Sequence, residues 1–200
     1  MLSVRVILPI APLLLLAACG GANPPPDAPP APAASEAPAA PPPAAPAAAP
    51  AAAPIVVAIA SKSGSKLTGT ATFTEVAGGV KVNIQVSGAP PGKVATHVHE
   101  TGDCSSPDGK SAGGHFNPAN HPHALPPAGE RHLGDLGNID VGPDGKGSLE
   151  IVAPGANLKP GDPNSYVGRA IIVHEKKDDG GQPVGNAGGR IGCGVIAASK

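Results

Sequence analysis

The chain of 200 residues contains 28 Gly and 27 Pro but only one Tyr, two Phe and no Trp. Pro and Gly at this level exclude a single uniform globule and indicate low-complexity sequence, a turn-rich β fold, or both. The formal net charge is −1, and the chain has no cluster of Lys and Arg with interleaved aromatic residues, which argues against a nucleic-acid-binding protein.

Residues 1–18 have the organisation of an export signal. Arg5 supplies the positive charge, and the apolar run over 6–18 that follows is too short to span a bilayer. The run ends in Leu16-Ala17-Ala18-Cys19, which resembles the bacterial lipobox, where cleavage before the cysteine follows acylation of its sulfur. We therefore expect an exported lipoprotein, held by lipid on Cys19 to a bacterial membrane and facing the periplasm or the cell exterior. The alternative is an ordinary secretory signal with an incidental cysteine.

Residues 19–54 follow as a segment made almost entirely of Pro and Ala, with Asp27 and Glu36 as its only charges. Without branched apolar or aromatic side chains, such a segment cannot bury enough surface to offset the entropy lost on ordering. We expect a disordered, extended tether between the lipidated cysteine and a folded domain. The alternative is a recognition segment for a proline-binding partner or a cell-wall polymer.

Residues 55–200 have the pattern of an all-β domain. Val80, Val82, Ile84 and Val86 alternate with polar residues, as expected of a strand with one buried face. Similar short runs, separated by Gly, Asn, Asp and Pro, predict strands at 55–61, 66–75, 80–87, 93–99, 134–141, 147–151, 170–174 and 194–197. This spacing favours a Greek-key β-sandwich or flattened barrel of about eight antiparallel strands. Two long loops remain, 100–131 and 175–190, and long loops of this kind are usually functional.

The seven histidines all lie between positions 97 and 174. His97 and His99 are two residues apart on a predicted strand, so their side chains leave the same face. In the Gly- and Pro-rich segment that follows, a set of three imidazoles and one carboxylate would suit a closed tetrahedral zinc site: His115, His123, His132 and Asp135. His174 ends an apolar run, an unusual place for an imidazole without a function.

Four blocks of sequence carry a family resemblance. They are His97-Val98-His99-Glu100, Gly113-Gly114-His115-Phe116-Asn117-Pro118, the run from Glu130 to Asn138, and Gly185 to Arg190 followed by Cys193-Gly194-Val195-Ile196. These blocks look like the signatures of copper/zinc superoxide dismutases and occur in the order found in that family. The resemblance covers essentially all of 55–200, and the insertion at 105–110 is more similar to bacterial than to eukaryotic members.

The resemblance implies a copper and a zinc site with one shared ligand. The copper ligands would be His97, His99, His115 and His174, and the zinc ligands His115, His123, His132 and Asp135. His115 would bridge the two metals as an imidazolate, a role that needs both ring nitrogens. His121 is the alternative to His123 at the zinc site. Asp178 would orient His97 and His123 through hydrogen bonds, unless it is merely a solvated member of the pair with Asp179.

The three cysteines leave one unpaired if all are counted toward disulfides. Because the lipobox assigns Cys19 to lipid, Cys104 and Cys193 are left to form a bridge. Such a bond would join the first long loop to the last strand, and it implies an oxidising compartment.

The activity implied by the resemblance is dismutation of two superoxide anions to O2 and H2O2, with copper cycling between Cu(II) and Cu(I). Arg190 resembles the family's anion-guiding arginine. Lys and Arg balance Asp and Glu over 55–200, so guidance of the anion must be local, with Lys176 and Lys177 as further candidates. The leading alternative is a non-catalytic lipoprotein that buffers or delivers copper on the same fold. A zinc hydrolase is a weaker alternative, because no general base remains apart from these ligands.

Overall fold

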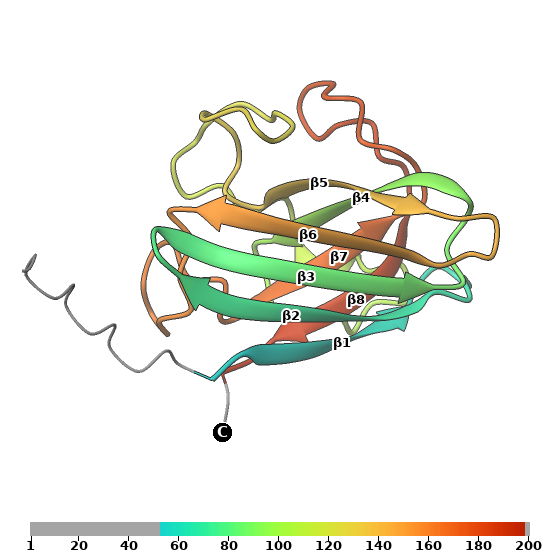
Figure 1. Cartoon of the computed structure of the whole chain (residues 1–200), viewed down its shortest axis with the longest axis horizontal. Coiled ribbons are helices and arrows are strands. Elements are labelled where there is room, and N and C mark those ends of the chain that lie inside the picture. The colour runs from blue at the N-terminus through green and yellow to red at the C-terminus, as the bar shows by residue number, and fades with distance from the viewer. Residues whose placement is uncertain (1–52, 199–200) are drawn as a thin grey trace, which may run out of the picture. The chain divides into compact units, whose positions relative to one another are not determined.

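A computed structural model describes residues 53–198 of the chain (Figure 1). The predicted signal peptide, the lipid on Cys19 and nearly all of the Pro/Ala tether lie outside the described residues. Within 53–198, no helix has the length and apolar character needed to cross a membrane.

Eight strands form a closed antiparallel barrel, and a single turn of 3-10 helix, η1 at Lys110–Ala112, lies in the first long loop. The strands are β1 Ile55–Ser61, β2 Thr68–Val76, β3 Gly79–Ser87, β4 Gly92–His99, β5 Asp135–Val141, β6 Gly147–Pro154, β7 Arg169–His174 and β8 Arg190–Ile196. Their order around the barrel is β1-β2-β3-β6-β5-β4-β7-β8. The predicted all-β fold with about eight antiparallel strands is therefore confirmed.

The topology is that of a Greek key, because β3 pairs with β6 and β4 pairs with β7 rather than each strand pairing only with its sequence neighbours. Two of the strand pairings that close the barrel, called seams here, are short. β5 pairs with β6 only through Asp140–Ser148 and Val141–Gly147, and β1 pairs with β8 only at Ala60 and Ser61. Between these seams, the barrel consists of two four-stranded layers, which corresponds to the flattened barrel expected from the sequence.

Alternation of apolar and polar residues determines which side of each strand is buried. Val80, Val82, Ile84 and Val86 of β3 are buried, while Gln85 between them is exposed. The same alternation places Ile55, Val57 and Ile59 of β1 in the core. The inward residues of both layers therefore form one hydrophobic core.

The last strand begins at Arg190, four residues earlier than the sequence pattern predicted. Glycine has low strand propensity, so Gly192 and Gly194 obscured the start of the strand. The packing explains both glycines: a Cβ at Gly192 would lie 2.6 Å from Cδ2 of Leu67, and one at Gly194 would lie 2.6 Å from the carbonyl oxygen of Ala58. β6 also extends three residues beyond the predicted end, to Pro154.

The three aromatic residues of the chain pack together, and one of them, Phe116, belongs to the first long loop. Tyr166 meets Phe73 and Phe116 edge to face, with ring centroids 6.0 and 6.1 Å away. Its hydroxyl donates to the carbonyl of Leu133 at 2.6 Å, and burial raises the pKa of the phenol. The cluster anchors the loop on both sides of its metal-binding residues, since Phe116 directly follows His115 and Leu133 directly follows His132.

Candidate metal centre

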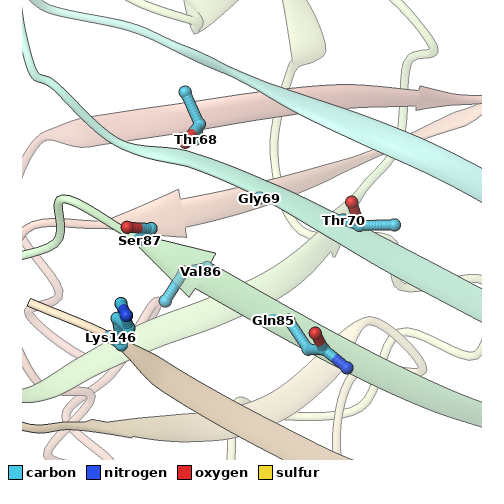
Figure 2. Close-up of a pocket in the computed structure, with 7 residues that line it drawn as sticks. All are labelled: Thr68, Gly69, Thr70, Gln85, Val86, Ser87 and Lys146. Atoms are coloured by element: carbon cyan, nitrogen blue, oxygen red, sulfur yellow. The ribbon is translucent and has the colours of Figure 1, made fainter.

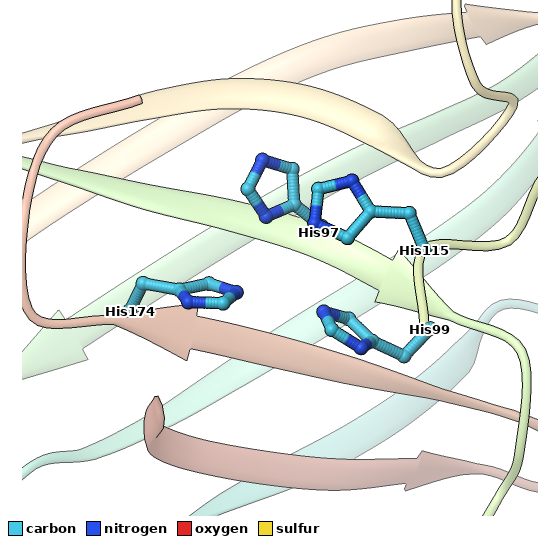
Figure 3. Close-up of side chains that lie close together, drawn as sticks. All are labelled: His97, His99, His115 and His174. Atoms are coloured by element: carbon cyan, nitrogen blue, oxygen red, sulfur yellow. The ribbon is translucent and has the colours of Figure 1, made fainter. Parts of the chain in front are cut away.

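Two groups of four buried side chains each direct nitrogen or oxygen atoms toward a common point. In each group the atoms that could bind a metal lie within 4.8 Å of one another. The first group, shown in Figure 3, is His97, His99, His115 and His174, and the second is His115, His123, His132 and Asp135. Because His115 belongs to both groups, they form one continuous cluster.

The first group is assembled from two strands and a loop (Figure 3). His97 and His99 project from the same face of β4, since they are two residues apart. His115 has no strand of its own but forms an isolated antiparallel bridge with His99. The next residue continues this contact, because the N–H of Phe116 donates to the carbonyl of Val98 at 2.9 Å. The bridge explains how a loop residue is held beside a strand.

Asp135, the first residue of β5, organises the second group. Its Oδ1 lies 2.9 Å from Nδ1 of His115 and 3.2 Å from Nδ1 of His132. Its Oδ2 lies 3.0 Å from Nδ1 of His123. Burial by itself would raise the pKa of Asp135, but the hydrogen bond with His115 and the nearby imidazoles outweigh it and lower the pKa. The carboxylate is therefore ionised at neutral pH, as a metal ligand must be.

Several buried nitrogens in this cluster have no hydrogen-bond partner. Within the described part of the chain, five buried side-chain nitrogen or oxygen atoms are unpaired, and four of them are His97 Nδ1, His99 Nε2, His123 Nδ1 and His174 Nε2. His123 Nδ1 is close to Asp135 but not in hydrogen-bond geometry. Unpaired buried polar atoms are costly and rare. Their concentration around one point fits metal ligation.

The opposite nitrogen of each of these four rings is held in place. Nδ1 of His99 lies 2.9 Å from the carbonyl oxygen of Gly113, and Nδ1 of His174 lies 3.3 Å from that of Gly188. Carbonyl partners require N–H on these nitrogens, which leaves Nε2 of each ring with a free lone pair. Hydrogen bonds of this kind fix the tautomer and orientation of metal-binding histidines.

Asp178 provides the equivalent contacts for the other two rings. Its Oδ2 lies 2.8 Å from Nε2 of His97, and its Oδ1 lies 3.0 Å from Nε2 of His123. The side chain of Asn138 braces its backbone, accepting from the N–H of Asp178 at 2.7 Å and donating to its carbonyl at 3.0 Å. Burial opposes ionisation of Asp178, but the hydrogen bonds from His97 and His123 prevail and hold its pKa well below the usual range.

His97, His99 and His174 of the first group are neutral at physiological pH. Burial lowers the pKa of His97 to about 4, that of His99 to about 2 and that of His174 to about 3. Hydrogen bonds with Asp178, Gly113 and Gly188 oppose this effect without overcoming it. Neutral imidazoles keep the lone pair with which histidine binds a metal.

A surface cavity of ≈ 470 Å³ leads to the first group. Its lining includes His115, His174, Arg190, Asp108 and Lys110. His115 and His174 are the partly accessible members of the group, 8% and 6% exposed, while His97 and His99 are covered. A small solute entering this cavity therefore reaches the shared histidine in a space that is also lined by the cations Arg190 and Lys110 and the anion Asp108.

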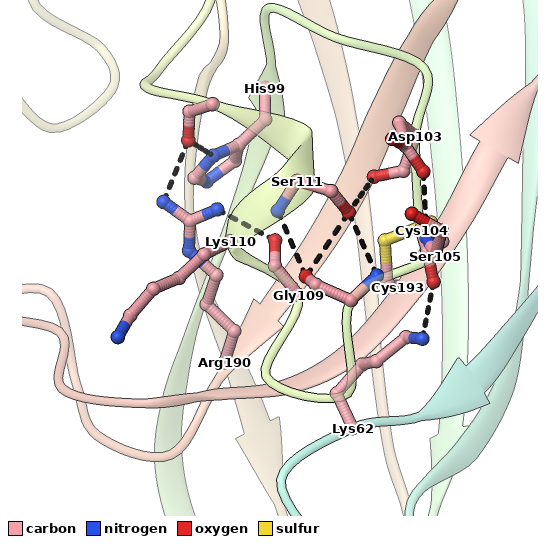
Figure 4. Close-up of a disulfide and its surroundings, with 12 residues drawn as sticks. Lys62, His99, Asp103, Cys104, Ser105, Gly109, Lys110, Ser111, Arg190 and Cys193 are labelled. Atoms are coloured by element: carbon pink, nitrogen blue, oxygen red, sulfur yellow. Dashed lines mark hydrogen bonds between the residues drawn. A yellow bond between two sulfur atoms is a disulfide. The ribbon is translucent and has the colours of Figure 1, made fainter.

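Arg190 is fixed at the wall of the cavity by two carbonyl groups (Figure 4). Its Nη1 donates to the carbonyl of Gly109 at 2.8 Å and its Nη2 to that of Gly113 at 2.7 Å. The carbonyl of Gly113 also bonds the ring of His99. Burial lowers the pKa of Arg190, but guanidinium groups stay protonated in proteins. The cation is thus held in one geometry beside the cluster.

The disulfide between Cys104 and Cys193 joins the first long loop to β8 (Figure 4). It links residues 89 apart in sequence, and closing a loop of this length stabilises a fold by roughly 4 kcal/mol in the chain-entropy model. The loop segment that it ties down continues to Gly109 and Gly113, which hold Arg190.

Residues 67–196 match the family described as copper/zinc superoxide dismutase (SODC), which is more than half of the chain. The chain belongs to the copper/zinc superoxide dismutase family. It is 38% identical over 143 residues to superoxide dismutase [Cu-Zn] 1 of Aquifex aeolicus, covering 69% of this chain and 84% of that protein. It is also 38% identical over 143 residues to the extracellular superoxide dismutase [Cu-Zn] of Brugia pahangi, covering 66% and 70%.

Solved structures show the same fold. A SOD-like protein from Bacillus subtilis is 36% identical, with a TM-score of 0.63 over 70% of this chain and 97% of that chain. The clock protein EA4 is 37% identical, with a TM-score of 0.65 over 72% of this chain and 93% of that chain. The copper/zinc superoxide dismutase fold therefore extends over the part of the chain that the structure describes.

The cofactors of this copper/zinc superoxide dismutase family member are copper and zinc, and its two donor sets fit them. Four imidazoles suit copper, while three imidazoles and one carboxylate suit tetrahedral zinc. His121, the alternative at the second group, lies outside it. Its Nδ1 faces the carbonyl oxygen of Arg131 at 3.3 Å.

The lysine that lines the cavity differs from those expected from the sequence. Lys110 lines the cavity, whereas Lys176 and Lys177, the candidates from the sequence, are not among its lining residues. Only the three-dimensional path of the loop around η1 brings Lys110 there. A second surface groove, shown in Figure 2, lies on the outer side of β2 and β3, and its single charged residue is Lys146. Nothing in its lining resembles a metal or acid–base site.

Proposed function

We propose that the protein is a superoxide dismutase that converts two superoxide anions to O2 and H2O2. The observation that carries this proposal is the pair of buried donor sets that share His115 and open, beside Arg190, into a surface cavity. Bound copper supplies one-electron chemistry by alternating between Cu(II) and Cu(I), while zinc is redox-inert and shapes the site.

In this proposal the copper ligands are His97, His99, His115 and His174, and the zinc ligands are His115, His123, His132 and Asp135. The unpaired nitrogens support the assignment, since one from each of four rings faces its group. Asp178 spans the two sites by holding one ring of each. A disturbance at this carboxylate should therefore reach both metals.

His115 is the catalytic histidine of the proposal. Its Nδ1 lies with Asp135 and His132 on the zinc side, which leaves Nε2 for the copper side. Because His115 is partly exposed to the cavity, Nε2, when not bound to copper, would accept a proton from solvent and donate it to the second superoxide. A residue in this role needs two functional ring nitrogens, and His115 is the only histidine that the two groups share.

Arg190 is the proposed binding and guiding residue for superoxide. Its guanidinium is fixed by Gly109 and Gly113 and faces the cavity with His115 and His174. A fixed cation at a concave, partly desolvated site raises the local concentration of a small anion. A protein that only buffers or delivers copper would need the copper ligands but not this cation, so Arg190 favours the enzyme.

The proposal includes export and membrane attachment. Residues 1–18 would be removed as a lipoprotein signal, Cys19 would carry lipid, and 19–54 would tether the domain 55–200 to a bacterial membrane. The disulfide supports an oxidising compartment, such as the periplasm or the cell exterior.

The test is metal analysis and superoxide decay with the purified protein. We expect one copper and one zinc per chain and decay far above the spontaneous rate. His115→Ala should abolish dismutation and weaken both metals, since the ring belongs to both groups. A parent protein that binds copper but leaves superoxide decay at the spontaneous rate would refute the enzyme and favour copper buffering.

A further inference from the structure

Gln182, in the loop 175–189 between β7 and β8, hydrogen-bonds both backbone groups of His123. The N–H of His123 donates to Oε1 of Gln182 at 3.2 Å, and Nε2 of Gln182 donates to the carbonyl of His123 at 2.6 Å. The two residues are 59 apart in sequence. Figure 1 shows their two loops, drawn in yellow and in orange-red, above β5 and β4.

The backbone on either side of His123 is held by side chains rather than by a strand: the N–H of Ala124 donates to Oδ2 of Asp135 at 3.2 Å and the N–H of His121 to Oδ1 of Asn117 at 3.1 Å. Residues 117–131 contain no strand or helix, and four prolines in this range remove backbone donors. At His123 itself, the side-chain amide of Gln182 supplies both backbone hydrogen bonds, which a neighbouring strand would supply in a sheet. Such a pair of bonds fixes the position of the His123 Cα, which a contact at the ring alone cannot do.

The turn that carries Gln182 is closed by its own hydrogen bonds. The N–H of Gly185 donates to the carbonyl of Gly181 at 2.6 Å, and the N–H of Asp179 donates to the carbonyl of Gly185 at 3.0 Å. Asn186 adds a side-chain bond to Oδ1 of Asp179 at 3.1 Å. Gln182 is thus presented from a defined turn rather than from an open loop.

The same loop also holds the ring of His123, through Asp178 at Nε2. Three contacts therefore converge on one residue, two at its backbone and one at its imidazole. They direct Nδ1 toward Asp135, whose Oδ2 is 3.0 Å away. With its backbone and its Nε2 both held, the side chain of His123 is preorganised, so metal binding costs little further conformational entropy.

We propose that Gln182 is a positioning residue for the zinc site, acting through the backbone of His123. The inference rests on the proposed function, in which His123 is a zinc ligand. Coupling of this kind is reciprocal, so zinc bound through His123 also restrains the loop that carries Gln182. That loop includes Val184 and Gly188, which line the cavity leading to His115.

The test compares Gln182→Ala and Gln182→Glu with Asn186→Gly in the copper- and zinc-loaded protein. Gln182→Ala removes both bonds to His123, and Gln182→Glu places a carboxylate oxygen against its carbonyl. Asn186→Gly loosens the same turn without touching His123, and glycine tolerates the positive φ of 52° at that position. The measurement is zinc affinity by competition with a chelator, together with the visible spectrum of Co²⁺ substituted at the zinc site.

We expect both Gln182 variants to bind zinc roughly 10-fold or more weakly, the usual effect of removing a partner that orients a ligand. Their Co²⁺ spectra should change, while Asn186→Gly should stay within twofold of the parent in zinc affinity. Zinc affinity in Gln182→Ala equal to that of the parent overturns the inference, as does an equal loss in Asn186→Gly. If the parent binds zinc and dismutates superoxide, such a result leaves the proposed function intact; a parent without zinc refutes both.

Amide hydrogen exchange of the metal-free proteins provides a measurement that needs no metal. The amide of His123 should exchange faster in Gln182→Ala than in Asn186→Gly, because only the first variant removes its acceptor. Equal exchange in the parent and in Gln182→Ala contradicts the inference even if the variant binds zinc weakly for another reason.

Discussion

Asp178 Oδ2 lies 2.8 Å from Nε2 of His97, deep inside the domain, and both side chains are inaccessible to solvent. The other oxygen of the same carboxylate lies 3.0 Å from Nε2 of His123, in the second donor group. One acidic residue in the loop 175–189 therefore orients a ring on each side of His115. The neighbouring Asp179 differs, since its partners are Gly181 and Asn186 of its own turn.

We predict that Asp178→Asn weakens zinc binding by about 10- to 100-fold, as loss of a carboxylate partner typically does, and also alters the copper site. The amide accepts one N–H but turns its own N–H₂ toward the other ring, so His97 and His123 cannot both be held. Chelator competition for zinc and electron paramagnetic resonance of Cu(II) measure the two effects. Asp179→Asn is the matched control, and equal losses in the two variants would show that Asp178 has no special role.

The fold could be predicted where one residue type marks one face of a strand. In β3 the alternation of Val and Ile with polar residues is complete, and the strand was placed within a residue of its observed start. β8 was placed four residues late because Gly192 and Gly194, which have low strand propensity, are required by close packing against Leu67 and Ala58. Apolar alternation identifies strands whose residues are buried for their hydrophobicity. It does not identify strand residues, such as Gly192 and Gly194, that are small because a neighbour lies too close for a side chain.

The donor groups could be predicted because their motifs stand at fixed spacings, such as His97-Val98-His99, in blocks that resemble a family. The contacts that orient them are harder to predict. Asn138 and Gln182 meet Asp178 and His123 across 40 and 59 residues. No sequence spacing indicates which backbone group an Asn or Gln side chain will bind, so these hydrogen bonds are visible only in the folded structure.

Stability of the metal-free protein should fall as the pH drops from about 6.5 to about 4. Burial lowers the pKa of His97 to about 4 and that of His174 to about 3, whereas in the unfolded chain a histidine titrates near pH 6.5. Between these values the unfolded state binds more protons than the folded state. The free energy of unfolding therefore decreases with falling pH, by up to about 1.4 kcal/mol per pH unit for each such histidine.

Urea unfolding of the metal-free protein at several pH values measures this effect. Asp135 and Asp178 do not contribute to this pH dependence. Their pKa values are lowered in the folded protein, and an unfolded Asp titrates near pH 3.9. The stability that they provide is therefore lost only below about pH 4. The metal-loaded protein should lose stability in the same direction, because its occupied imidazoles also take up no proton in the folded state. A metal-free protein whose stability is constant or rises between pH 6.5 and 4 contradicts the prediction.

Cys104 and Cys193 should resist alkylation in the folded protein until a reductant is added, because they form a disulfide. Cys193→Ser should destabilise the fold by roughly 4 kcal/mol in the chain-entropy model. It should also lower dismutation, since the loop segment that Cys104 anchors continues to the two carbonyls that hold Arg190. Peptide mapping after alkylation checks the bond, and a free thiol in air-oxidised, folded protein would exclude it.

Cys19 should be the first residue of the mature protein and should carry acyl chains. Two or more chains anchor a protein stably, whereas one alone binds a membrane only marginally. Cys19→Ser should therefore leave the protein unprocessed or released from the membrane fraction. Mass spectrometry of the N-terminal peptide and membrane fractionation provide the measurements. A Cys19→Ser variant that is processed and fractionates like the parent would indicate a plain secretory signal.

Arg190 should attract superoxide into the cavity more strongly than the nearby lysines do. Arg190 and Lys110 line it beside His115, whereas Lys176 does not. Arg190 is fixed by two carbonyls, while Lys110 is exposed and pairs with Asp108 at 3.2 Å. Because a fixed, partly buried cation is screened less than an exposed one, Arg190 should dominate the attraction of the anion.

Arg190→Glu, Lys110→Glu and Lys176→Glu each change the net charge by the same amount, so they separate a local field from a global one. We expect kcat/KM to fall roughly 10-fold or more in Arg190→Glu, within the range that electrostatic focusing supplies. Lys110→Glu should have a smaller effect and Lys176→Glu almost none, with copper and zinc content unchanged in all three. The rate of the parent should fall as salt rises, while that of Arg190→Glu should fall less or even rise, because screening then relieves repulsion. Equal losses in the three variants would mean that only net charge matters, and a parent-like rate and salt dependence in Arg190→Glu would exclude the guiding role.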